Sequence, residues 1–302
     1  MRQYLAVLKD ILETGEWVEN TRTQTRCLTK INVDFKYNVG KGEFPLLTTR
    51  KVGIKTAIGE VLAYIRGYTR LEQFHKLGVH SWDANATHPT WLESPYYRGE
   101  GDVGLIYGGV ANNLPYIEWG RYNTDRLIAM TPMKNPFLDI YERLLRGEDN
   151  RRLIWSFWYP NMFHLGCLPP CLYEHQFSLV NDKLYLNSTQ RSADMPIGVG
   201  SANMVQCYFI LWLMAKLTGK EPMVANHRIV NAHIYENQIE GVKTQLNQKV
   251  SKLKPKFVCL REFTIEDVLD DTRPTALTPD DFKVIYPTGY KHPPVIKFPF
   301  TA

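Results

Sequence analysis

The stretch CLPPCLYEHQFSLVNDKLYLNSTQRSAD, residues 167–194, decides the fold. Its alternating pattern predicts strands at 175–180 and 184–191, and the Asn-Asp pair between them suits a tight hairpin turn. Further strands are predicted at 30–37 and 152–158. These runs together indicate a β-sheet.

Three other segments have the apolar spacing of helices. They are residues 2–15, 54–67 and 203–218. Strands and helices in this arrangement predict an α+β protein. Because the chain has no internal repeat, linker or sharp change of composition, one domain over residues 1–302 is expected. The Pro-rich end, GYKHPPVIKFPFTA, is expected to be a non-helical tail that packs over another part of the protein.

Composition excludes several classes of protein. With 302 residues and 44% hydrophobic composition, the chain can bury a substantial core without disulfides. Its five cysteines have irregular spacing without a CxxC pair, so we expect a reducing compartment and no metal site. The N-terminus lacks the apolar core of a signal peptide. The longest apolar run, 204–217, is too short for a bilayer and is expected to be a buried helix of a soluble, cytoplasmic protein.

The charge pattern indicates the kind of ligand. The net charge is +5, and the basic residues come as scattered pairs such as Arg50-Lys51 and Arg151-Arg152. That distribution suits a phosphorylated small molecule better than a polynucleotide. An RNA-binding regulator is the non-enzyme alternative, although no arginine-rich or aromatic-basic motif supports it. Tight RNA binding that survives moderate salt would favour that alternative.

Two features of the central stretch and its surroundings suit covalent chemistry on a phosphorylated ligand. Cys171 follows two prolines that restrict the backbone, and a nearby arginine would favour its thiolate, although inert buried cysteines are commoner. Arg151 and Arg152 open an apolar strand, either as a solvated pair or as a bidentate clamp for a phosphate.

Other polar residues occupy positions that favour proton transfer or binding. Glu60 has Val61 and Tyr64 among its helical neighbours, so we expect its carboxylate at the edge of the core. Burial there would raise its pKa towards the range of proton transfer, whereas pairing with an arginine would make it structural. His233 and Tyr235 are two residues apart and share one face if their segment is extended.

The second strand of the predicted hairpin has a face that is polar along its length. This face comprises Tyr185, Asn187, Thr189 and Arg191. It is either an exposed face of the sheet or the floor of a wet pocket.

Taken together, these pieces resemble the thymidylate synthase family along nearly the whole chain. The matching motifs are FPLLTTRK (44–51), EVLAYIRG (60–67), SWDAN (81–85), DNRRLIWSFWYP (149–160), LPPC (168–171), QRSAD (190–194), LMAKLTGKEP (213–222) and AHIYENQ (232–238). They occur in the family's order with family-like spacing, so the combination is specific. The resemblance implies a mixed β-sheet layered with helices, one face of which forms the interface of a homodimer.

The resemblance also implies roles for residues that match the motifs. Cys171 would be the nucleophile that adds to C6 of a pyrimidine nucleotide, with Glu60 as general acid/base and Tyr107 in the network that removes the C5 proton. The residues expected at the nucleotide are Arg22, Gln190, Arg191, Ser192, Asn203, His233 and Tyr235, with Arg151 and Arg152 reaching across from the partner subunit. The residues expected at the reduced folate, 5,10-methylenetetrahydrofolate, are Trp82, Leu168, Asp194 and Ala302.

The choice of base depends on one residue in the family. An asparagine amide reads O4 and N3–H of uracil, whereas relatives that modify cytosine use aspartate. Counting forward from Arg191 places Ala202 at this position, and counting backward from residues 213–222 places Asn203 there. We favour Asn203, because the Gly-rich IGVGSA segment can absorb one extra residue. The expected substrate is therefore dUMP, and a CMP or dCMP hydroxymethylase is the alternative if Asn203 does not face the base.

The chain departs from the family pattern around the C5 side of the pocket. Leu172 replaces a histidine after the nucleophile, a Gln-Trp-Arg motif is absent after Tyr107, and the segment 200–206 replaces PFNIAS. Residues 230–233 replace the family's GDxH. Phosphate and ribose contacts are retained, so binding is expected to persist while the reaction at C5 differs.

The expected product follows from one of these departures. Gly200, Ser201 and Ala202 replace a bulky aromatic wall, so we expect water to reach the C5 methylene. The product would then be 5-hydroxymethyl-dUMP, as in a phage-type deoxyuridylate hydroxymethylase that works in the host cytoplasm. The alternative is a thymidylate synthase that makes dTMP and dihydrofolate.

Overall fold

The structure is a computed structural model of the chain. It describes residues 2–20, 24–113, 115–119, 127–132, 134–149 and 151–300.

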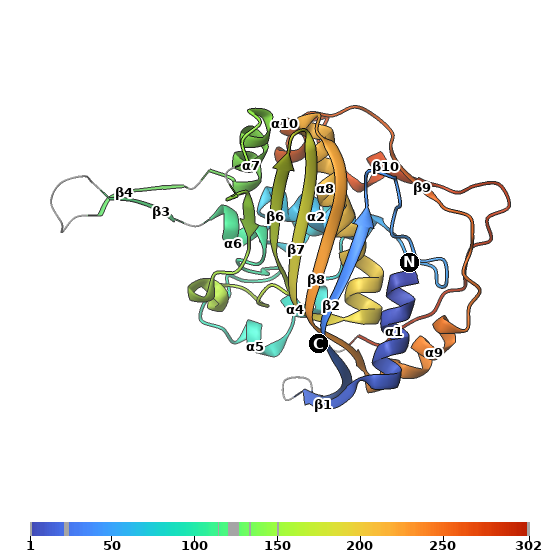
Figure 1. Ribbon diagram of the computed structural model, residues 1–302. Coiled ribbons are helices and arrows are strands. Elements are labelled where there is room, and N and C mark those ends of the chain that lie inside the picture. Colours follow the sequence, from blue (N-terminus) through green and yellow to red (C-terminus); the bar gives the residue numbers. More distant parts are fainter. Residues whose placement is uncertain are drawn as a thin grey trace.

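A six-stranded sheet forms the centre of the protein (Figure 1). From one edge to the other, its strands are β1 (Glu16–Asn20), β2 (Thr25–Asn38), β8 (Glu221–Tyr235), β7 (Lys183–Asp194), β6 (Leu172–Val180) and β5 (Ile154–Ser156). Strands β7 and β8 are parallel and the other neighbours are antiparallel, so the sheet is mixed. Two small ribbons pair β3 (Pro115–Trp119) with β4 (Leu127–Pro132) and β9 (Lys256–Cys259) with β10 (Phe282–Ile285).

Helices account for most of the remaining regular structure. The α-helices are α1 (Arg2–Thr14), α2 (Lys55–Arg66), α3 (Leu71–Lys76), α4 (Asp83–Ala86), α5 (Pro89–Leu92), α6 (Gly108–Asn112), α7 (Pro136–Leu145), α8 (Met204–Thr218), α9 (Ile239–Leu246) and α10 (Ile265–Leu269). Short 3₁₀ helices cover Pro160–Leu165, Glu236–Gln238 and Pro279–Asp281, and a π-helix covers Met195–Asn203. The predicted α+β class is confirmed.

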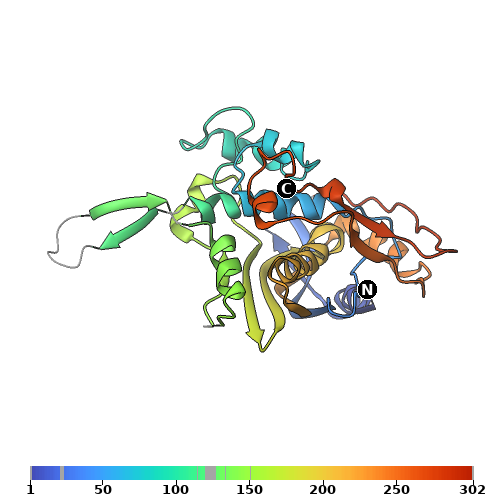
Figure 2. The same cartoon turned by 90° about the horizontal axis from the view of Figure 1, so that it is seen from above.

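Helices α8 and α2 lie together on one side of the sheet (Figures 1 and 2). Nearly every residue of α2 between Ala57 and Ile65 is buried, and α8 is buried along most of its length. The apolar residues on the inner side of the strands pack against these two helices and form one core. The catalytic candidates lie at the end of this core, where β7 and β8 approach the start of α8.

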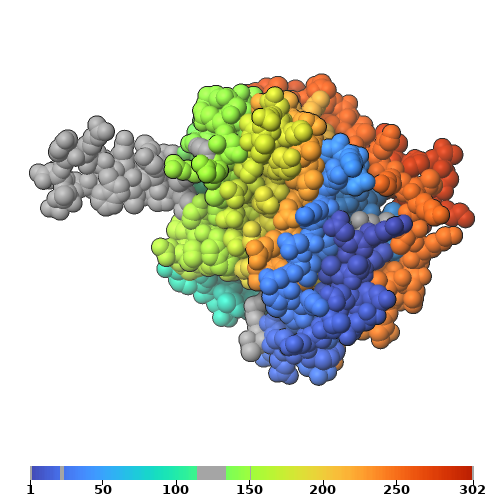
Figure 3. Space-filling view, viewed as in Figure 1, coloured from blue at the N-terminus to red at the C-terminus, as the bar shows by residue number. Residues whose placement is uncertain are grey.

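The other face of the sheet is not covered by any other described element (Figure 3). Large apolar side chains on the strands remain exposed, including Ile31 and Val230 at 53% and 38%. The polar side chains Tyr185, Asn187 and Thr189 lie on the same strand face, alternating with the buried Leu184 and Leu186. Asn187 is exposed, whereas Tyr185, Thr189 and Arg191 are half-buried, so the predicted polar face is only partly exposed. None of the four residues lines the cavity described below.

The hairpin between β6 and β7 has the predicted tight turn. Asn181 and Asp182 form its loop, and Asn181 has a φ of +54°, the left-handed conformation that asparagine tolerates. The strand predicted at 152–158 is shorter, because only Ile154–Ser156 pairs with β6 before a 3₁₀ helix begins at Pro160.

The π-helix and α8 form one continuous helical segment, Met195–Thr218. By length and composition alone, this segment is long and apolar enough to cross a membrane, but 67% of its most apolar window is buried inside the protein. It is therefore the central core helix that the apolar run predicted.

The C-terminal tail packs against the rest of the protein, as predicted. The backbone N–H of Lys51 donates to the Pro294 carbonyl at 2.8 Å, and Gln238 Nε2 donates to the Pro299 carbonyl at 3.2 Å. The Arg50 guanidinium lies 4.8 Å from the centre of the Phe298 ring. These contacts bring the end of the tail to the candidate site.

Candidate active site

A cavity of about 250 Å³ lies between the inner side of the sheet and α2. It is lined by Glu60, Tyr64, Ser81, Trp82, Asn85, Tyr107, Leu168, Cys171, Gln190, Ser192, Asp194, Ile197, Gly198, Ala202, Asn203, Gln206, His233, Tyr235 and Phe300. Most residues selected from the sequence therefore meet in one place, although they are scattered along the chain.

Cys171 is fixed through its backbone. Its N–H donates to Tyr107 Oη at 3.0 Å, and its carbonyl accepts from the N–H of Arg191 at 2.9 Å. The Arg191 guanidinium donates from Nε to the Pro170 carbonyl at 2.9 Å and from Nη2 to the Pro169 carbonyl at 3.0 Å. The thiol is thus presented to the cavity by a loop that one arginine ties to the end of β7.

Tyr107 occupies an unusual backbone conformation beside Cys171. Its φ is +43°, a region that residues with side chains rarely adopt and that is typical of functional sites. The ring stacks on Tyr64 with centroids 4.4 Å apart, and burial raises the pKa of both phenols above their ordinary value. Gly108 makes this approach possible, since a Cβ there would lie 1.6 Å from the Tyr64 carbonyl oxygen.

Glu60 is buried at the opposite wall of the cavity, on α2. One carboxylate oxygen accepts from Ser81 Oγ, and the other accepts from Gln206 Nε2 at 2.6 Å. Burial raises its pKa from 4.5 to about 7, while both hydrogen bonds act to lower it. These partners are not arginines, so the interpretation of Glu60 as half of a structural ion pair is wrong.

The hydrogen bonds at Glu60 continue as a chain across the core. Gln206 Oε1 accepts from Asn203 Nδ2 at 2.9 Å, and Asn203 Oδ1 accepts from Gln190 Nε2 at 3.1 Å. Gln190 Oε1 in turn accepts from His227 Nε2 at 2.8 Å. At the far end, the Tyr37 hydroxyl lies 3.1 Å from His227 Nδ1.

The donors and acceptors of these hydrogen bonds all run in one direction, from Tyr37 towards Glu60. Burial lowers the pKa of His227 to about 3, so its ring is neutral and carries a single N–H. That hydrogen lies on Nε2, so Nδ1 accepts from the Tyr37 hydroxyl. Each amide that follows accepts through its oxygen from the His227 side and donates through its nitrogen towards Glu60. The orientation of the Asn203 amide is therefore set through Gln190 by His227, which does not line the cavity. One N–H and one lone pair of Asn203 remain for a ligand.

The π-helix explains the conflict between the two sequence counts. A π-helix bonds each residue to one five positions away and so accommodates an additional residue where an α-helix would not. The Met195–Asn203 segment has this geometry and ends at the residue that joins the hydrogen-bonded chain. Asn203 and Ala202 both line the cavity, but only Asn203 carries an amide.

Gly200 and Ser201 do not line the cavity. A Cβ on Gly200 would lie 2.4 Å from the Tyr4 hydroxyl, and Ser201 Oγ accepts from Arg50 Nη2 at 3.0 Å. Gly200 thus packs against Tyr4 of α1 and Ser201 against Arg50, whereas Ala202 lines the cavity. Of the three residues expected to open the C5 wall to water, only Ala202 reaches the cavity, because counting along the chain does not reveal which side of a π-helix faces the ligand.

Asp194 lies where β7 meets the π-helix. Its Oδ1 accepts from the Ile197 N–H and its Oδ2 accepts from Gln238 Nε2, both at 2.8 Å. Burial raises its pKa to about 6, partly offset by these bonds and by Arg50. The carboxylate is held at the edge of the cavity, close to where Gln238 also binds the tail.

His233 and Tyr235 line the same wall from β8, as their spacing predicted. Their rings meet edge to face with centroids 5.1 Å apart, and His233 Nδ1 lies 2.9 Å from Asn231 Oδ1. Trp82 and Leu168 border the cavity, and Ser192 lies beside Asp194 on β7.

The predicted phosphate residues are not all brought together. Arg151 and Arg152 are exposed at the start of β5 and do not line the cavity of this subunit. Arg191 donates from two of its guanidinium nitrogens to the carbonyls of the two prolines that precede Cys171. Arg22 and Ala302 lie outside the residues that the structure describes.

Sequence reasoning missed several residues of the site. Gln206 hydrogen-bonds to both Glu60 and Asn203. The sequence could have indicated it, because Gln206 is a polar residue within the most apolar helix of the protein. Ser81 and Phe300 line the cavity without an obvious sequence signal. His227 is buried on β8, beside the β7 strand that carries its partner Gln190, and only strand pairing shows its connection to the site.

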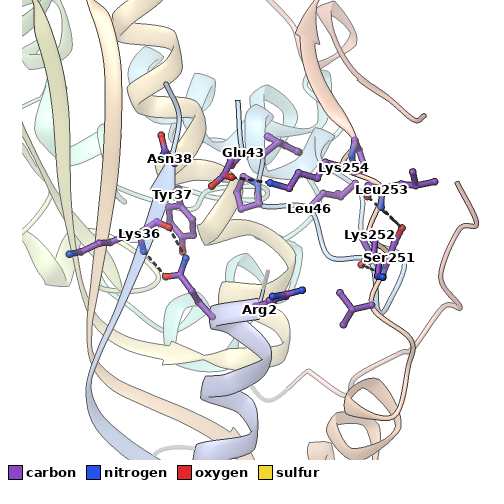
Figure 4. A pocket seen from close by; sticks show the side chains of 16 residues that line it. Arg2, Lys36, Tyr37, Asn38, Glu43, Leu46, Ser251, Lys252, Leu253 and Lys254 are labelled. Atoms are coloured by element: carbon purple, nitrogen blue, oxygen red, sulfur yellow. Dashed lines mark hydrogen bonds and ion pairs between the residues drawn. The ribbon is translucent and has the colours of Figure 1, made fainter. Parts of the chain in front are cut away.

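A second, larger cavity of about 590 Å³ lies near the start of α1 and the end of β2 (Figure 4). Its charged rim includes Arg2, Lys36 and Lys252, and Lys254 pairs with Glu43 at 2.9 Å. Its lining contains neither a cysteine nor a carboxylate whose pKa is raised by burial. The smaller cavity around Cys171 is therefore the candidate active site.

Comparison with known proteins agrees with this geometry. The thymidylate synthase family model matches residues 2–302. The chain is 45% identical over 309 residues to a protein of Glaesserella parasuis serovar 5 (strain SH0165) named thymidylate synthase, covering 100% of both chains. Proteins of the same name from Marinomonas sp. (strain MWYL1) and Shewanella frigidimarina (strain NCIMB 400) are each 44% identical, again with 100% of both chains covered.

Proposed function

Because the chain belongs to the thymidylate synthase family, we propose that it methylates dUMP at C5 and releases dTMP and dihydrofolate. Members of this family are one-carbon transferases that use methylenetetrahydrofolate as co-substrate. The observation that carries the proposal is the cavity in which Cys171, Glu60 and an oriented Asn203 amide meet. The catalytic unit would comprise residues 1–302.

The methylated product replaces the hydroxymethylated product expected from the sequence. Curated relatives that match over their full length are named thymidylate synthase. The main argument for hydroxymethylation is also weaker than expected, since Gly200 lies against Tyr4, Ser201 bonds Arg50, and only Ala202 of the three residues lines the cavity. Phe300 lines the cavity from the C-terminal tail and supplies an aromatic wall that would exclude water.

In the proposed reaction, Cys171 begins the chemistry. Its thiolate forms a bond to C6 of uracil, and the electrons of the C5–C6 double bond move onto C5 and O4. C5 would then bond to the one-carbon unit and lose its proton, and the bond from that carbon to the folate nitrogen would break. A hydride from the folate would add to the same carbon as the C6–S bond breaks and the C5–C6 double bond re-forms. Tyr107 Oη, held beside the Cys171 backbone, would belong to the network that accepts the C5 proton.

Glu60 would supply and remove protons at the base. With a pKa of about 7, it is present in both protonation states near neutral pH. Gln206 can only donate to the carboxylate through Nε2, so the carboxyl proton belongs on the oxygen beside Ser81, whose hydroxyl can accept it.

Asn203 would choose uracil over cytosine. Its remaining lone pair would accept from N3–H and its remaining N–H would donate to O4, a pattern that cytosine cannot match. His227 would act as a positioning residue, because its single N–H fixes Gln190 and thereby Asn203.

The residues at the mouth of the cavity fit a reduced folate. Trp82, Leu168, Ile197 and Phe300 offer flat and apolar surface for a heteroaromatic ring, and the Asp194 carboxylate can accept from ring N–H groups. When bound there, the folate would supply the one-carbon unit and the hydride that reduces it. Ala302 would complete this wall as the end of the tail.

The phosphate and ribose would bind at the β7–β8 end of the cavity. His233 and Tyr235 suit the 3′-hydroxyl, and Ser192, the remaining donors of Arg191, and Arg22 suit the 5′-phosphate. Arg151 and Arg152 would reach the phosphate of the partner subunit in a homodimer formed by the exposed sheet face. Large apolar residues that remain exposed on the strands of the sheet support this arrangement. We place the enzyme in the cytoplasm.

Steady-state kinetics test the proposal. The protein is mixed with methylenetetrahydrofolate and either dUMP or dCMP, and dihydrofolate is followed by absorbance. We expect turnover with dUMP, much slower turnover with dCMP, and none in the Cys171→Ser variant. The Cys167→Ser variant removes a neighbouring cysteine that does not line the cavity and should remain active. Preference for dCMP, or turnover without Cys171, would overturn the proposal.

A further inference from the structure

Two imidazoles and a carboxylate meet on the surface next to the segment that carries Ser81 and Trp82. His75 Nε2 lies 2.7 Å from Asp83 Oδ1, and His80 Nδ1 lies 3.3 Å from Asp83 Oδ2. The imidazole rings stack with centroids 4.4 Å apart, and one ligand atom from each residue lies within 4.8 Å of the other two. We propose that this histidine cluster, His75, His80 and Asp83, binds a divalent transition-metal ion such as Zn²⁺.

The donor set selects the class of metal. Two imidazole nitrogens and one carboxylate oxygen suit Zn²⁺, Ni²⁺, Cu²⁺ and Fe²⁺, whereas Mg²⁺ and Ca²⁺ prefer oxygen ligands. Zinc bonds to such ligands are about 2.0–2.2 Å long, so neighbouring ligand atoms around a tetrahedral ion lie about 3.3–3.6 Å apart. The observed nitrogen–oxygen separations of 2.7 and 3.3 Å are at or slightly below that spacing, so small side-chain rotations would make room for an ion.

The backbone that carries the histidine cluster is fixed by the core. Each of the three ligands directly follows a buried residue: Phe74, Val79 and Trp82 are 0%, 0% and 5% exposed. Phe74 and Trp82 contact each other through their rings, and Gly78, with a φ of +68°, turns the chain between the two histidines. The three ligands are thus held by anchored backbone rather than by a loose loop, which lowers the cost of arranging them around an ion.

The side chains of the cluster are accessible from solvent. Those of His75, His80 and Asp83 are 39%, 65% and 45% exposed. Water or a second ligand can therefore complete the coordination of an ion that three protein ligands leave open. None of the three residues lines the cavity around Cys171, so the ion would not take part in the chemistry of C5.

A bound ion would still affect the wall of that cavity. His80 and Asp83 flank Ser81, which donates to Glu60, and Trp82, which lines the cavity. An ion that joins the ends of this four-residue segment would hold both inner residues in place. We therefore expect metal binding to raise the melting temperature, since the ion binds only the folded arrangement.

Isothermal titration calorimetry of the intact, tag-free protein tests the site. The Cys171→Ser background removes the cavity thiol as a competing ligand, and EDTA followed by dialysis removes bound metal. We expect one Zn²⁺ per chain and no binding of Mg²⁺. His75→Ala and His80→Ala should each weaken Zn²⁺ binding by about tenfold or more, and His88→Ala, an exposed histidine of α5's N-terminus, should leave it unchanged.

A second measurement keeps the test independent of heats of binding. Co²⁺ bound to nitrogen and oxygen ligands gives visible absorption bands, which should appear in the parent and in His88→Ala and disappear in the double variant lacking His75 and His80. Melting curves without metal show that each variant is folded. No Zn²⁺ binding by the parent, or unchanged affinity in both histidine variants, would overturn the proposal.

Discussion

Replacing Glu60 with glutamine is predicted to lower turnover strongly and to stabilise the protein at alkaline pH. Burial raises the pKa of this carboxyl from 4.5 to about 7. A raised carboxyl pKa means that the charged form is less favourable in the folded state than in the unfolded state. Wild-type stability should therefore fall as the pH rises from about 4.5 to about 7, and the loss is complete above the higher value.

The size of the effect follows from the two pKa values. The interval between 4.5 and about 7, at 1.36 kcal/mol per pH unit, corresponds to a penalty of about 3 kcal/mol for ionised Glu60. Glutamine does not ionise and escapes this penalty. Its carbonyl can accept from Gln206 Nε2 while its amide donates to Ser81 Oγ, so both neighbours keep a partner.

Thermal melting at about pH 5 and about pH 8.5 measures this difference. At the higher pH, Glu60→Gln should melt about 5 °C above wild type for a chain of this size, and at the lower pH most of the gain should vanish. Glu72→Gln, which alters an exposed carboxylate on α3, should show no such dependence. Turnover of Glu60→Gln should fall about 100- to 10,000-fold, the usual contribution of a general acid/base. Equal melting temperatures of the variant and the wild type at the higher pH would refute the raised pKa of the buried Glu60 carboxyl. Retained turnover would refute its role in proton transfer.

Three other substitutions probe separate parts of the site. His227→Phe should release the Gln190 amide, lowering kcat/KM for dUMP about tenfold and narrowing the preference for dUMP over dCMP; an unchanged preference would contradict the positioning role. Gly108→Ala should lower the free energy of unfolding in urea by about 3 kcal/mol, because the added Cβ collides with the backbone of α2. Gly53→Ala, which has open space around it, should lower it far less. Phe300→Ala should raise the KM for the folate about tenfold and produce some 5-hydroxymethyl-dUMP by admitting water. An unchanged KM in steady-state kinetics, or dTMP as the sole product by mass spectrometry, would contradict this role.

Periodicity was sufficient to predict the elements that are long and uniform. The hairpin turn at Asn181 and the core helix after Asn203 follow from local chemistry, since turn residues and a continuous apolar run leave few alternatives. The π-helix was not predicted, because its hydrogen-bond spacing has no distinct apolar period in so short a segment. That omission led to the wrong orientation for Gly200 and Ser201.

Motif spacing located most of the site but not its internal connections. Cys171, Glu60 and Asp194 meet at one cavity as the family resemblance implied. The link from Asn203 to His227 depends on which residues of β7 and β8 lie side by side, and that register is a property of the whole sheet.

Identification of the nucleotide product tests the proposed function most directly. The protein is incubated with dUMP and methylenetetrahydrofolate, the nucleotide is identified by mass spectrometry, and dihydrofolate is measured in the same sample. We predict dTMP and dihydrofolate in equal amounts, because Phe300 of the tail lines the cavity, whereas Gly200 and Ser201 of the π-helix do not. A hydroxymethylated nucleotide without dihydrofolate would contradict this account.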